Sequence, residues 1–244
     1  MNPSHGIPHP LVLSGRTALV TGGSGALGRA VVKVFRDAGA QVHVPIFDPN
    51  EIPELEAHLE GDLSRVHLHR DVDLTRPEGV DGLFGELPPV EVVANLAGGF
   101  AMAGIEATDP ATWERMFRMN ATTAFLVSRA AFPAMRAAGF GRILMVSAFP
   151  AVDRGAAGMT AYGAAKAAVL NLTQALAREG AEHGITANAV LPSIIDTEAN
   201  REAMPDADRK RWLKPDEIAR VLRFLASEEA GIVTGAAVPL TLAP

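Results

Sequence analysis

The fold of this chain is decided by residues 16–28, which read RTALVTGGSGALG. The run from Arg16 to Thr21 is short and contains β-branched residues, so it predicts a strand. Apolar residues then recur at helical spacing from Ala30 until Gly39 stops them. The glycine-rich segment therefore joins a strand to a helix. In that context a Gly-x-Gly-x-x-Gly signal indicates a dinucleotide-binding turn rather than a flexible loop.

Small residues in this turn let backbone amides approach a pyrophosphate, whose charge is favoured at the N-terminus of the following helix. We therefore expect a dinucleotide to contact Gly22, Ser24, Gly25, Ala26, Leu27 and Gly28. Asp48 lies about 20 residues beyond Gly28, the offset at which an acidic side chain can hold a ribose hydroxyl. Asp48 is thus a further expected cofactor contact.

The same alternation of strand and helix continues along the chain. Strands are predicted at 16–21, 41–47, 66–69, 90–94, 142–146, 185–190 and 236–240, with helical signal between most of them. Such alternation predicts a parallel sheet covered on both faces. We expect one α/β domain of Rossmann type with a seven-stranded parallel sheet and helices on both faces. Residues 1–14 are expected to be an N-terminal tail, and residues 15–244 a single dinucleotide-binding catalytic domain.

Composition excludes several classes of function. The net charge is −6, and the only basic run, residues 209–211, is short and flanked by acids, so nucleic acid is not an expected partner. The chain has no cysteine, which excludes disulfides and thiolate chemistry. His67 and His69 alternate on one strand, but no third ligand is evident, so no metal site is expected. There is no signal-peptide pattern and no run of about 18 apolar residues, so we expect a cytoplasmic protein without membrane contact.

A second informative segment is residues 159–169, which read MTAYGAAKAAV. Tyr162 is the only tyrosine of the chain, and Lys166 is one of four lysines. The composition predicts a helix, on which positions i and i+4 share a face. A fixed positive charge beside a phenol lowers its pKa from about 10, so Tyr162 could act as a general acid or base at neutral pH. The alternative is a tyrosine at the edge of the core and a lysine in water.

Taken together, these segments resemble the short-chain dehydrogenase/reductase family over roughly residues 12–240. The resemblance rests on six motifs in order, which are Thr21-Gly22 with Gly28, Asp71-Val72, Asn95-Leu96-Ala97-Gly98, Asn120, Tyr162-x-x-x-Lys166 and residues 192–197 (PSIIDT). It implies reversible hydride transfer between NAD(P) and a small-molecule carbonyl or alcohol, with Tyr162 as general acid/base. The sequence departs from the family pattern at three positions. Ala26 and Ser193 each replace a glycine, and Leu96 replaces an asparagine.

The resemblance also implies roles for individual residues. Asp71 and Val72 would hold the adenine ring, and Lys166 would hold the nicotinamide ribose. Asn120 would kink its helix and hold a proton-relay water. The implied cofactor contacts beyond the glycine turn are Asp71, Val72, Asn95, Ala97, Gly98, Tyr162, Lys166, Pro192, Ser193, Ile195 and Thr197. Helices corresponding to residues 111–138 and 162–177 form subunit interfaces in this family, which implies a homodimer or homotetramer.

The serine of the family pattern is displaced. It normally lies thirteen residues before the tyrosine, which is Phe149 here, whereas aligning on residues 142–148 puts Ala148 in its slot. Ser147 and Phe149 would point the same way if the strand continued, because alternate residues of a strand share a face. Ser147 is therefore the candidate donor to the substrate carbonyl. The alternative is a strand-end serine that bonds backbone groups.

Cofactor choice and substrate stay open at this point. Ile46 stands where NAD-preferring members have aspartate, but Asp48 would repel a 2′-phosphate, so NAD is favoured over NADP. A local resemblance to dihydropteridine reductase, which also lacks the serine, covers residues 25–28, 97–100, 158–159, 191–197, 200–201 and 204–208. A quinonoid dihydropteridine reductase-like activity is therefore one alternative. A non-catalytic NAD(P)-sensing protein is another.

Overall fold

A computed structural model describes residues 12–149, 155 and 157–242. Seven strands form one sheet in the order β3-β2-β1-β4-β5-β6-β7, and all neighbouring pairs are parallel. Their bounds are β1 Thr17–Thr21, β2 Gln41–Pro45, β3 Val66–His69, β4 Val92–Asn95, β5 Gly141–Val146, β6 Ile185–Pro192 and β7 Ala237–Leu240. This confirms the predicted single α/β domain with a parallel seven-stranded sheet.

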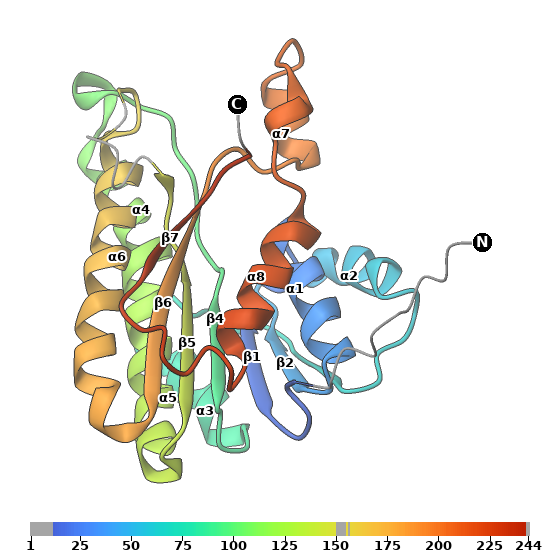
Figure 1. Ribbon diagram of the computed structural model, residues 1–244. Coiled ribbons are helices and arrows are strands. Elements are labelled where there is room, and N and C mark those ends of the chain that lie inside the picture. Colours follow the sequence, from blue (N-terminus) through green and yellow to red (C-terminus); the bar gives the residue numbers. More distant parts are fainter. Residues whose placement is uncertain (1–11, 150–154, 156, 243–244) are drawn as a thin grey trace.

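Helices cover both faces of the sheet (Figure 1). One face carries α1 (Ala26–Asp37), α2 (Ile52–His58) and α8 (Pro215–Ala226). The other carries α3 (Pro77–Glu86), α5 (Thr123–Ala138) and α6 (Thr160–Gly180), with α4 (Pro110–Phe117) beside α6. The short α7 (Glu198–Ala203) projects from the end of the molecule at which α6 begins. No helix in the described part of the chain is long and apolar enough to span a membrane.

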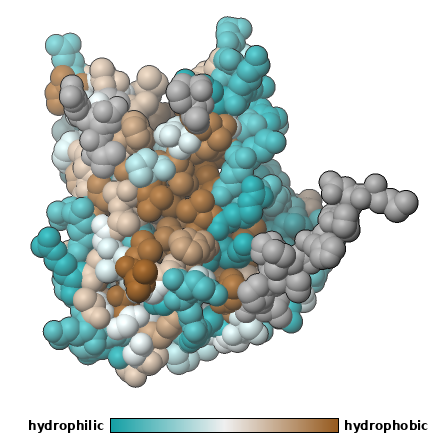
Figure 2. All heavy atoms as spheres, viewed as in Figure 1, coloured by the Kyte–Doolittle hydropathy of each residue, from teal (hydrophilic) through white to brown (hydrophobic). Residues whose placement is uncertain are grey.

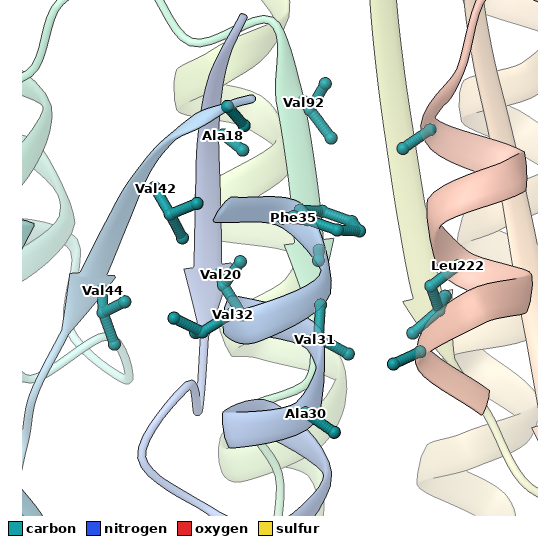
Figure 3. Close-up of a cluster of buried hydrophobic side chains, with 14 of the residues drawn as sticks. Ala18, Val20, Ala30, Val31, Val32, Phe35, Val42, Val44, Val92 and Leu222 are labelled. Carbon is teal, nitrogen blue, oxygen red and sulfur yellow. The ribbon is translucent and has the colours of Figure 1, made fainter. Parts of the chain in front are cut away.

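The core consists of two apolar layers, one on each face of the sheet. Val20 packs with Phe35 of α1 and Leu222 of α8 in one layer (Figure 3). Its neighbour Leu19 faces the opposite layer, with Leu126 of α5. Because successive residues of a strand point to opposite faces, the middle of a central parallel strand must be apolar on both faces. This explains why the strand predicted from residues 16–21 shows no polar alternation.

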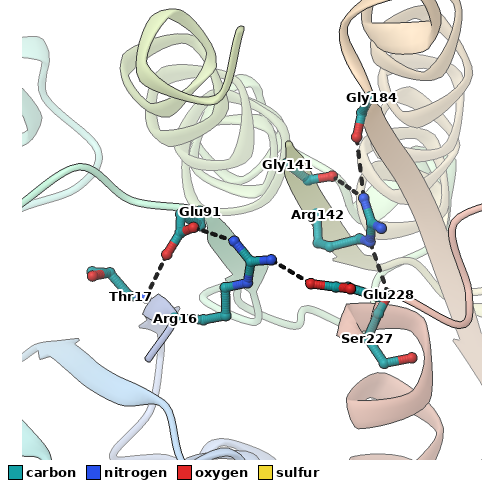
Figure 4. Close-up of polar contacts among 8 residues, drawn as sticks. All are labelled: Arg16, Thr17, Glu91, Gly141, Arg142, Gly184, Ser227 and Glu228. Atoms are coloured by element: carbon teal, nitrogen blue, oxygen red, sulfur yellow. Dashed lines mark hydrogen bonds and ion pairs between the residues drawn. The ribbon is translucent and has the colours of Figure 1, made fainter. Parts of the chain in front are cut away.

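The amino edge of the sheet is held together by two arginines (Figure 4). Arg16 pairs with Glu91 and Glu228 at 2.5 Å each. The buried Arg142 donates to the backbone carbonyls of Ser227 at 2.9 Å and Gly184 at 3.2 Å in two other segments, and to its neighbour Gly141 at 2.8 Å. Both guanidinium groups also stack on Phe140, with centroid distances of 3.8 and 4.2 Å. Strand starts and helix ends are thus cross-linked at this edge, which leaves the loops of the opposite edge for a site.

The predicted boundaries shift at two places. Leu13, which we expected in the tail, is buried, and its amide donates to the Ala38 carbonyl at 3.0 Å, so Leu13 belongs to the packed domain. The helical region at 111–138 is two helices, because a π-helical turn η3 (Arg118–Thr122), which contains Asn120, separates α4 from α5. Residues 1–11 lie outside the described part of the chain.

The structure adds a third histidine to the two noted in the sequence. The ring of His43 on β2 stacks on His67 at 4.6 Å, and its Nδ1 lies 3.0 Å from Nε2 of His69. The register in which β2 pairs with β3 brings these rings together, since His43 lies opposite His67. Burial, followed by the neighbouring histidines, lowers the pKa of His43 to about 4. No group of three metal-binding side chains with suitable geometry occurs among the described residues.

We expect these histidines to make the protein sensitive to acid. His43 is neutral in the folded state and titrates near 4, against 6.5 when unfolded, so its contribution to stability is present above pH 6.5 and is lost as the pH falls through 4. After allowance for solvent screening, we expect a loss of about 2 kcal/mol. Urea unfolding at pH 7 and pH 4.5 measures it. His43→Phe should lose clearly less than the wild type, and His183→Gln should match the wild type. Equal losses in His43→Phe and wild type would contradict the assignment.

Candidate active site

The expected site residues gather at the carboxyl edge of the sheet, around the ends of β1, β4, β5 and β6, which are successive neighbours. The chain order reverses between β1 and β4, because β2 and β3 lie on one side and β4 to β7 on the other. Parallel α/β sheets bind their ligands at such a reversal, outside the carboxyl ends of the strands. The position agrees with the dinucleotide turn predicted from residues 22–28.

The glycine turn is closely packed. Gly22 has a φ of +64°, and a Cβ atom on Gly28 would lie 2.0 Å from the carbonyl oxygen of Gly22, so neither position accepts a side chain easily. Helix α1 starts after Gly25, without a side-chain cap and without an acidic residue in its first turn. Its first amide groups are therefore available to an anion at the positive end of the helix dipole.

Thr21 fastens this turn to the loop after β4. Its Oγ1 donates to the Ala94 carbonyl at 3.4 Å and accepts from the amides of Leu96 and Ala97 at 3.1 Å each. A Cβ atom on Gly22 would lie 2.9 Å from the Ala97 amide nitrogen. The two loops predicted to contact the cofactor are thus in direct contact. Asn95 instead turns inward, where its Nδ2 donates to Ser128 Oγ at 3.2 Å.

The acids expected near the adenosine lie after β2 and β3. Asp48 is exposed and caps η1 (Pro49–Glu51), because its carboxylate accepts from the Asn50 amide at 3.0 Å and from Asn50 Nδ2 at 2.8 Å. Asp71 has a φ of +59°, and the adjacent Val72 amide donates to the Ile46 carbonyl at 3.0 Å. Neither of these two acidic residues is the one that bonds to the glycine turn.

That acid is Glu51, which the sequence analysis did not single out. Its carboxylate accepts a hydrogen bond from the hydroxyl of the buried Ser24. The nearby Arg29 pairs with Glu54 and donates to the Ser24 carbonyl at 3.2 Å. The end of the glycine turn is therefore lined by an acid, while the nearest arginine is already paired.

Asn120 lies in the π-helical turn and faces the loop after β4. Its Nδ2 donates to the carbonyls of Met116 at 2.9 Å and Gly99 at 3.1 Å. Its Oδ1 is buried and has no hydrogen-bond partner among the described residues. A Cβ atom on Gly98 would lie 2.5 Å from this Oδ1 and 3.5 Å from the Nζ of Lys166. Asn120, Gly98 and Lys166 therefore converge, and the unsatisfied acceptor marks the point.

Tyr162 and Lys166 lie in the first two turns of α6, on one face as predicted. The Nζ of the buried Lys166 lies 5.8 Å from the centre of the Tyr162 ring and donates to the Val146 carbonyl at 2.8 Å. Burial lowers the pKa of Lys166 to about 8. Burial also raises the pKa of Tyr162 to about 12.

The pKa direction of Tyr162 is opposite to the sequence prediction. We expected the lysine to lower the pKa of the phenol, but removal of water from the phenolate dominates in this structure. The ammonium group of Lys166 donates to the Val146 carbonyl, and burial lowers the pKa of this lysine, which disfavours its charged form. Tyr162 is therefore protonated at neutral pH and carries a proton to donate, although burial alone makes the phenol a weaker acid than free tyrosine.

The hydroxyl of Ser147 bonds a backbone group of the neighbouring helix. Strand β5 ends at Val146, so the alternation that would have turned Ser147 toward the site does not extend to it. The side chain is 1% exposed, and its hydroxyl donates to the carbonyl of Lys166 at 2.8 Å. This bond ties the end of β5 to α6, which is the alternative role of a strand-end serine that bonds a backbone group.

The segment after β6 returns to the sheet through short contacts. The Ser193 amide donates to the Leu240 carbonyl at 2.9 Å, and Ile195 forms a parallel bridge with Leu213. Thr197 caps α7, where its Oγ1 accepts from the Asn200 amide at 3.2 Å. Pro192, Ser193 and Ile195 thus stand at the carboxyl end of β6, while the side chain of Thr197 is used by the helix cap.

The fold and the cluster around Tyr162 are those of an oxidoreductase built on a dinucleotide-binding domain. The sequence profile of the family described as short chain dehydrogenase matches residues 16–208. An acetoacetyl-CoA reductase of Shinella zoogloeoides is 34% identical over 232 residues, covering 91% of this chain and 95% of the relative. A galactitol 2-dehydrogenase of Rhizobium johnstonii is 36% identical and covers 93% of both chains. This chain belongs to the short-chain dehydrogenase/reductase family.

One solved structure of the family carries its cofactor. A 3-oxoacyl (acyl-carrier-protein) reductase from Agrobacterium tumefaciens with NADP bound matches this structure with a TM-score of 0.85 at 26% identity, covering 94% of both chains. Both the family assignment and the enzyme class predicted from the sequence are thereby confirmed.

Proposed function

We propose that this oxidoreductase transfers hydride reversibly between NAD(P) and a small-molecule carbonyl or alcohol, with Tyr162 as the general acid/base. The observation that supports it most directly is the convergence of three segments at one point. The loop at Gly98, the π-helical turn at Asn120 and helix α6 at Lys166 meet at the carboxyl edge, next to the glycine turn. Few structural roles require a buried lysine and an unsatisfied buried amide oxygen together.

The residues present fit a dinucleotide. The amide groups at the start of α1 suit a pyrophosphate, since no acid in the first turn competes for them. Gly22, Ala97 and Gly98 keep the floor beside the turn free of long side chains. The expected contacts Pro192, Ser193 and Ile195 follow β6 at the same edge. The bound dinucleotide supplies or accepts the hydride, and the protein supplies position and protons.

The protein side chains then have distinct tasks. Tyr162, protonated at neutral pH, donates its phenolic proton to the oxygen of a carbonyl as that oxygen becomes negative. The charged Lys166 stabilises the phenolate left behind. The buried Asn120 Oδ1 holds a hydrogen-bond donor, such as the water that returns a proton to the site. Ser147 holds α6 in place through the Lys166 carbonyl.

A cofactor and substrate screen tests this proposal. Purified protein is mixed with NADH or NADPH and a panel of ketones, diketones and 3-oxoacyl thioesters, and oxidation is followed at 340 nm. Turnover of at least one carbonyl supports the assignment. Tight dinucleotide binding by calorimetry without turnover on any carbonyl would instead favour a non-catalytic NAD(P)-sensing protein.

We propose NAD as the preferred cofactor and Glu51 as its main selector. In this fold the adenosine ribose lies beside the loop after the second strand, where the Glu51 carboxylate meets Ser24. A 2′-phosphate there would meet a like charge, while the nearby Arg29 is paired with Glu54. We expect Glu51→Gln to lower the ratio of the NADPH dissociation constant to the NADH dissociation constant about tenfold, as measured by fluorescence titration.

Glu56→Gln is the matched control, since it removes the same charge from α2 itself. Its cofactor ratio should equal that of the wild type. If Glu56→Gln and Glu51→Gln shift the ratio equally, the preference reflects overall charge and not the position of Glu51. If NADPH already binds the wild type more tightly than NADH, the preference for NAD is wrong.

A second candidate is a reaction like that of dihydropteridine reductase. The inward turn of Ser147 favours it, because a reducible C=N group does not require the hydroxyl donor that a ketone oxygen uses. Mixing the protein with NADH and a quinonoid dihydropterin decides the matter. The absence of NADH oxidation above the uncatalysed rate would dismiss this candidate.

We also propose that the protein acts in the cytoplasm as a homodimer or homotetramer. Phe125 on α5 and Trp113 on α4 are large apolar side chains left exposed in the single chain. A second subunit packed on these helices would cover them. Light scattering coupled to size-exclusion chromatography at micromolar concentration measures the state, and a monomer would refute the proposal.

A further inference from the structure

The loop that follows β4 exposes an unusual amount of apolar surface. Phe100, Met102 and Ile105 are 59%, 71% and 75% exposed. Residues 99–105 read GFAMAGI, so no side chain of this stretch can form a hydrogen bond. Adjacent exposed apolar side chains mark a binding surface more often than chance, because water is a poor solvent for them.

This loop is anchored at both ends. Near its start, Asn120 Nδ2 donates to the Gly99 carbonyl at 3.1 Å. Further on, Ala103 forms a parallel bridge with Met159, and the Thr160 amide donates to the Ala103 carbonyl at 3.1 Å. The loop therefore lies along the beginning of α6 (Figure 1).

The anchoring brings the apolar strip to the proposed proton donor. The ring of Phe100 meets the ring of Tyr162 edge to face, with centroids 4.9 Å apart. The methyl group of Met102 would lie 3.8 Å from a Cβ atom on Gly158, just before α6. Figure 2 shows brown, apolar side chains in the middle of the face on which β6 and β7 lie in front. The exposed side of Phe100 therefore lies next to the proposed proton donor.

We propose that Phe100 and Met102 form the wall that binds the apolar body of the substrate, so that the preferred substrates are carbonyls attached to a flat aromatic or extended hydrocarbon group. This inference rests on the proposed function and narrows it. A polyhydroxylated substrate would lose water from its hydroxyl groups here without gaining side-chain partners, which disfavours it. An aromatic ring would instead cover Phe100 and gain a stacking contact.

Two diketones isolate the effect of the wall. 2,3-Butanedione and 1-phenyl-1,2-propanedione carry the same dicarbonyl unit and differ by a methyl against a phenyl group. The wild type should reduce the phenyl compound with the higher kcat/KM, and D-fructose should react far more slowly. Phe100→Ala should lower the ratio of kcat/KM for the phenyl compound to kcat/KM for 2,3-butanedione about tenfold, mainly through the KM of the phenyl compound.

Control variants distinguish a direct role of Phe100 in substrate binding from an indirect role in positioning Tyr162. Phe224→Ala truncates a phenylalanine of similar exposure on α8, on the opposite face of the sheet, and should change neither substrate. Phe100→Trp should keep the phenyl preference. If Phe100→Ala slows both diketones equally, or if D-fructose is the better substrate, the wall proposal is overturned.

Failure of the proposed function gives a different pattern. No turnover of either diketone, with NADH or with NADPH, counts against these compounds as substrates and against carbonyl reduction. Saturation-transfer NMR with 1-phenyl-1,2-propanedione then tests the wall without catalysis. A binding signal that Phe100→Ala abolishes supports the apolar wall. Absence of a signal with the wild type overturns it.

Discussion

Tyr162→Phe is expected to lower kcat about 10³-fold while leaving cofactor binding and folding unchanged. The substitution removes only the phenolic oxygen, and the ring keeps its edge contact with Phe100. The proton for the developing alkoxide must then come from water, which is neither positioned nor activated. Steady-state kinetics with the best carbonyl of the screen measures the change. Calorimetric dissociation constants for the dinucleotide should stay within about threefold of the wild type.

The kinetic loss must be separated from disturbed packing. Phe117→Leu, which alters a partly buried ring in the same small apolar cluster, serves as a packing control and should cost far less activity. If Tyr162→Phe keeps more than a tenth of the wild-type kcat, Tyr162 is not the general acid. A residue elsewhere in the site would then have to supply the proton.

The same tyrosine allows a direct measurement of its ionisation. Tyr162 is the only tyrosine of the chain, so phenolate absorbance near 295 nm reports on this one group. Its pKa is raised to about 12 by burial, so the folded protein should show no phenolate signal at pH 10.5, where a free tyrosine is mostly ionised. A midpoint below 10 in the folded protein would show that Lys166 outweighs the loss of water.

Lys166→Met is expected to lower kcat/KM about 10³-fold with little loss of stability. A pKa of about 8 against 10.5 for a free lysine corresponds to a penalty of about 3 kcal/mol for the buried charge, which methionine removes. The variant also loses the bond from Nζ to the Val146 carbonyl, at a cost of about 1–3 kcal/mol. The two changes nearly offset each other, so urea unfolding at pH 7 should give a similar free energy.

The pH dependence of stability identifies the buried lysine. A lysine whose pKa falls on folding contributes stability that is present above pH 10.5 and is lost as the pH falls through 8. As the pH rises from 8 to 10.5, the free energy of unfolding of the wild type should therefore increase by about 3 kcal/mol relative to that of Lys166→Met. Lys210→Met, a control on an exposed segment, should follow the wild type. A Lys166→Met protein that is fully active, or several kcal/mol less stable, would contradict the catalytic role.

Much of the fold was predictable because its signals are local. The strand at residues 16–21, the glycine turn and the helix after it depend on neighbours within a few positions. The pairing of Tyr162 with Lys166 on one face follows from helix geometry, and the structure agrees. The break in the helix at Asn120 was expected only from the family resemblance, because a π-helical turn leaves no clear mark in composition.

Other features depend on contacts between distant segments. The histidine cluster required the register of β2 against β3, which sequence spacing does not reveal. The contact between Glu51 and Ser24 joins two loops that are 27 residues apart. The strand rule misplaced Ser147 because it assumed that β5 extends past Val146. Phe100 could have been noticed as an apolar residue in a glycine- and alanine-rich loop, but its contact with Tyr162 was not visible.

The sequence by itself determined the doubly wound sheet, the dinucleotide turn and the identity of the tyrosine–lysine pair, because short-range periodicity and glycine placement encode them. Only the tertiary structure decided how these groups behave. Tyr162 stays protonated, burial lowers the pKa of Lys166, and the hydroxyl of Ser147 bonds the Lys166 carbonyl. The physical reason is burial. Loss of water and the choice of hydrogen-bond partner depend on which distant segments surround a side chain, and no local pattern specifies that environment.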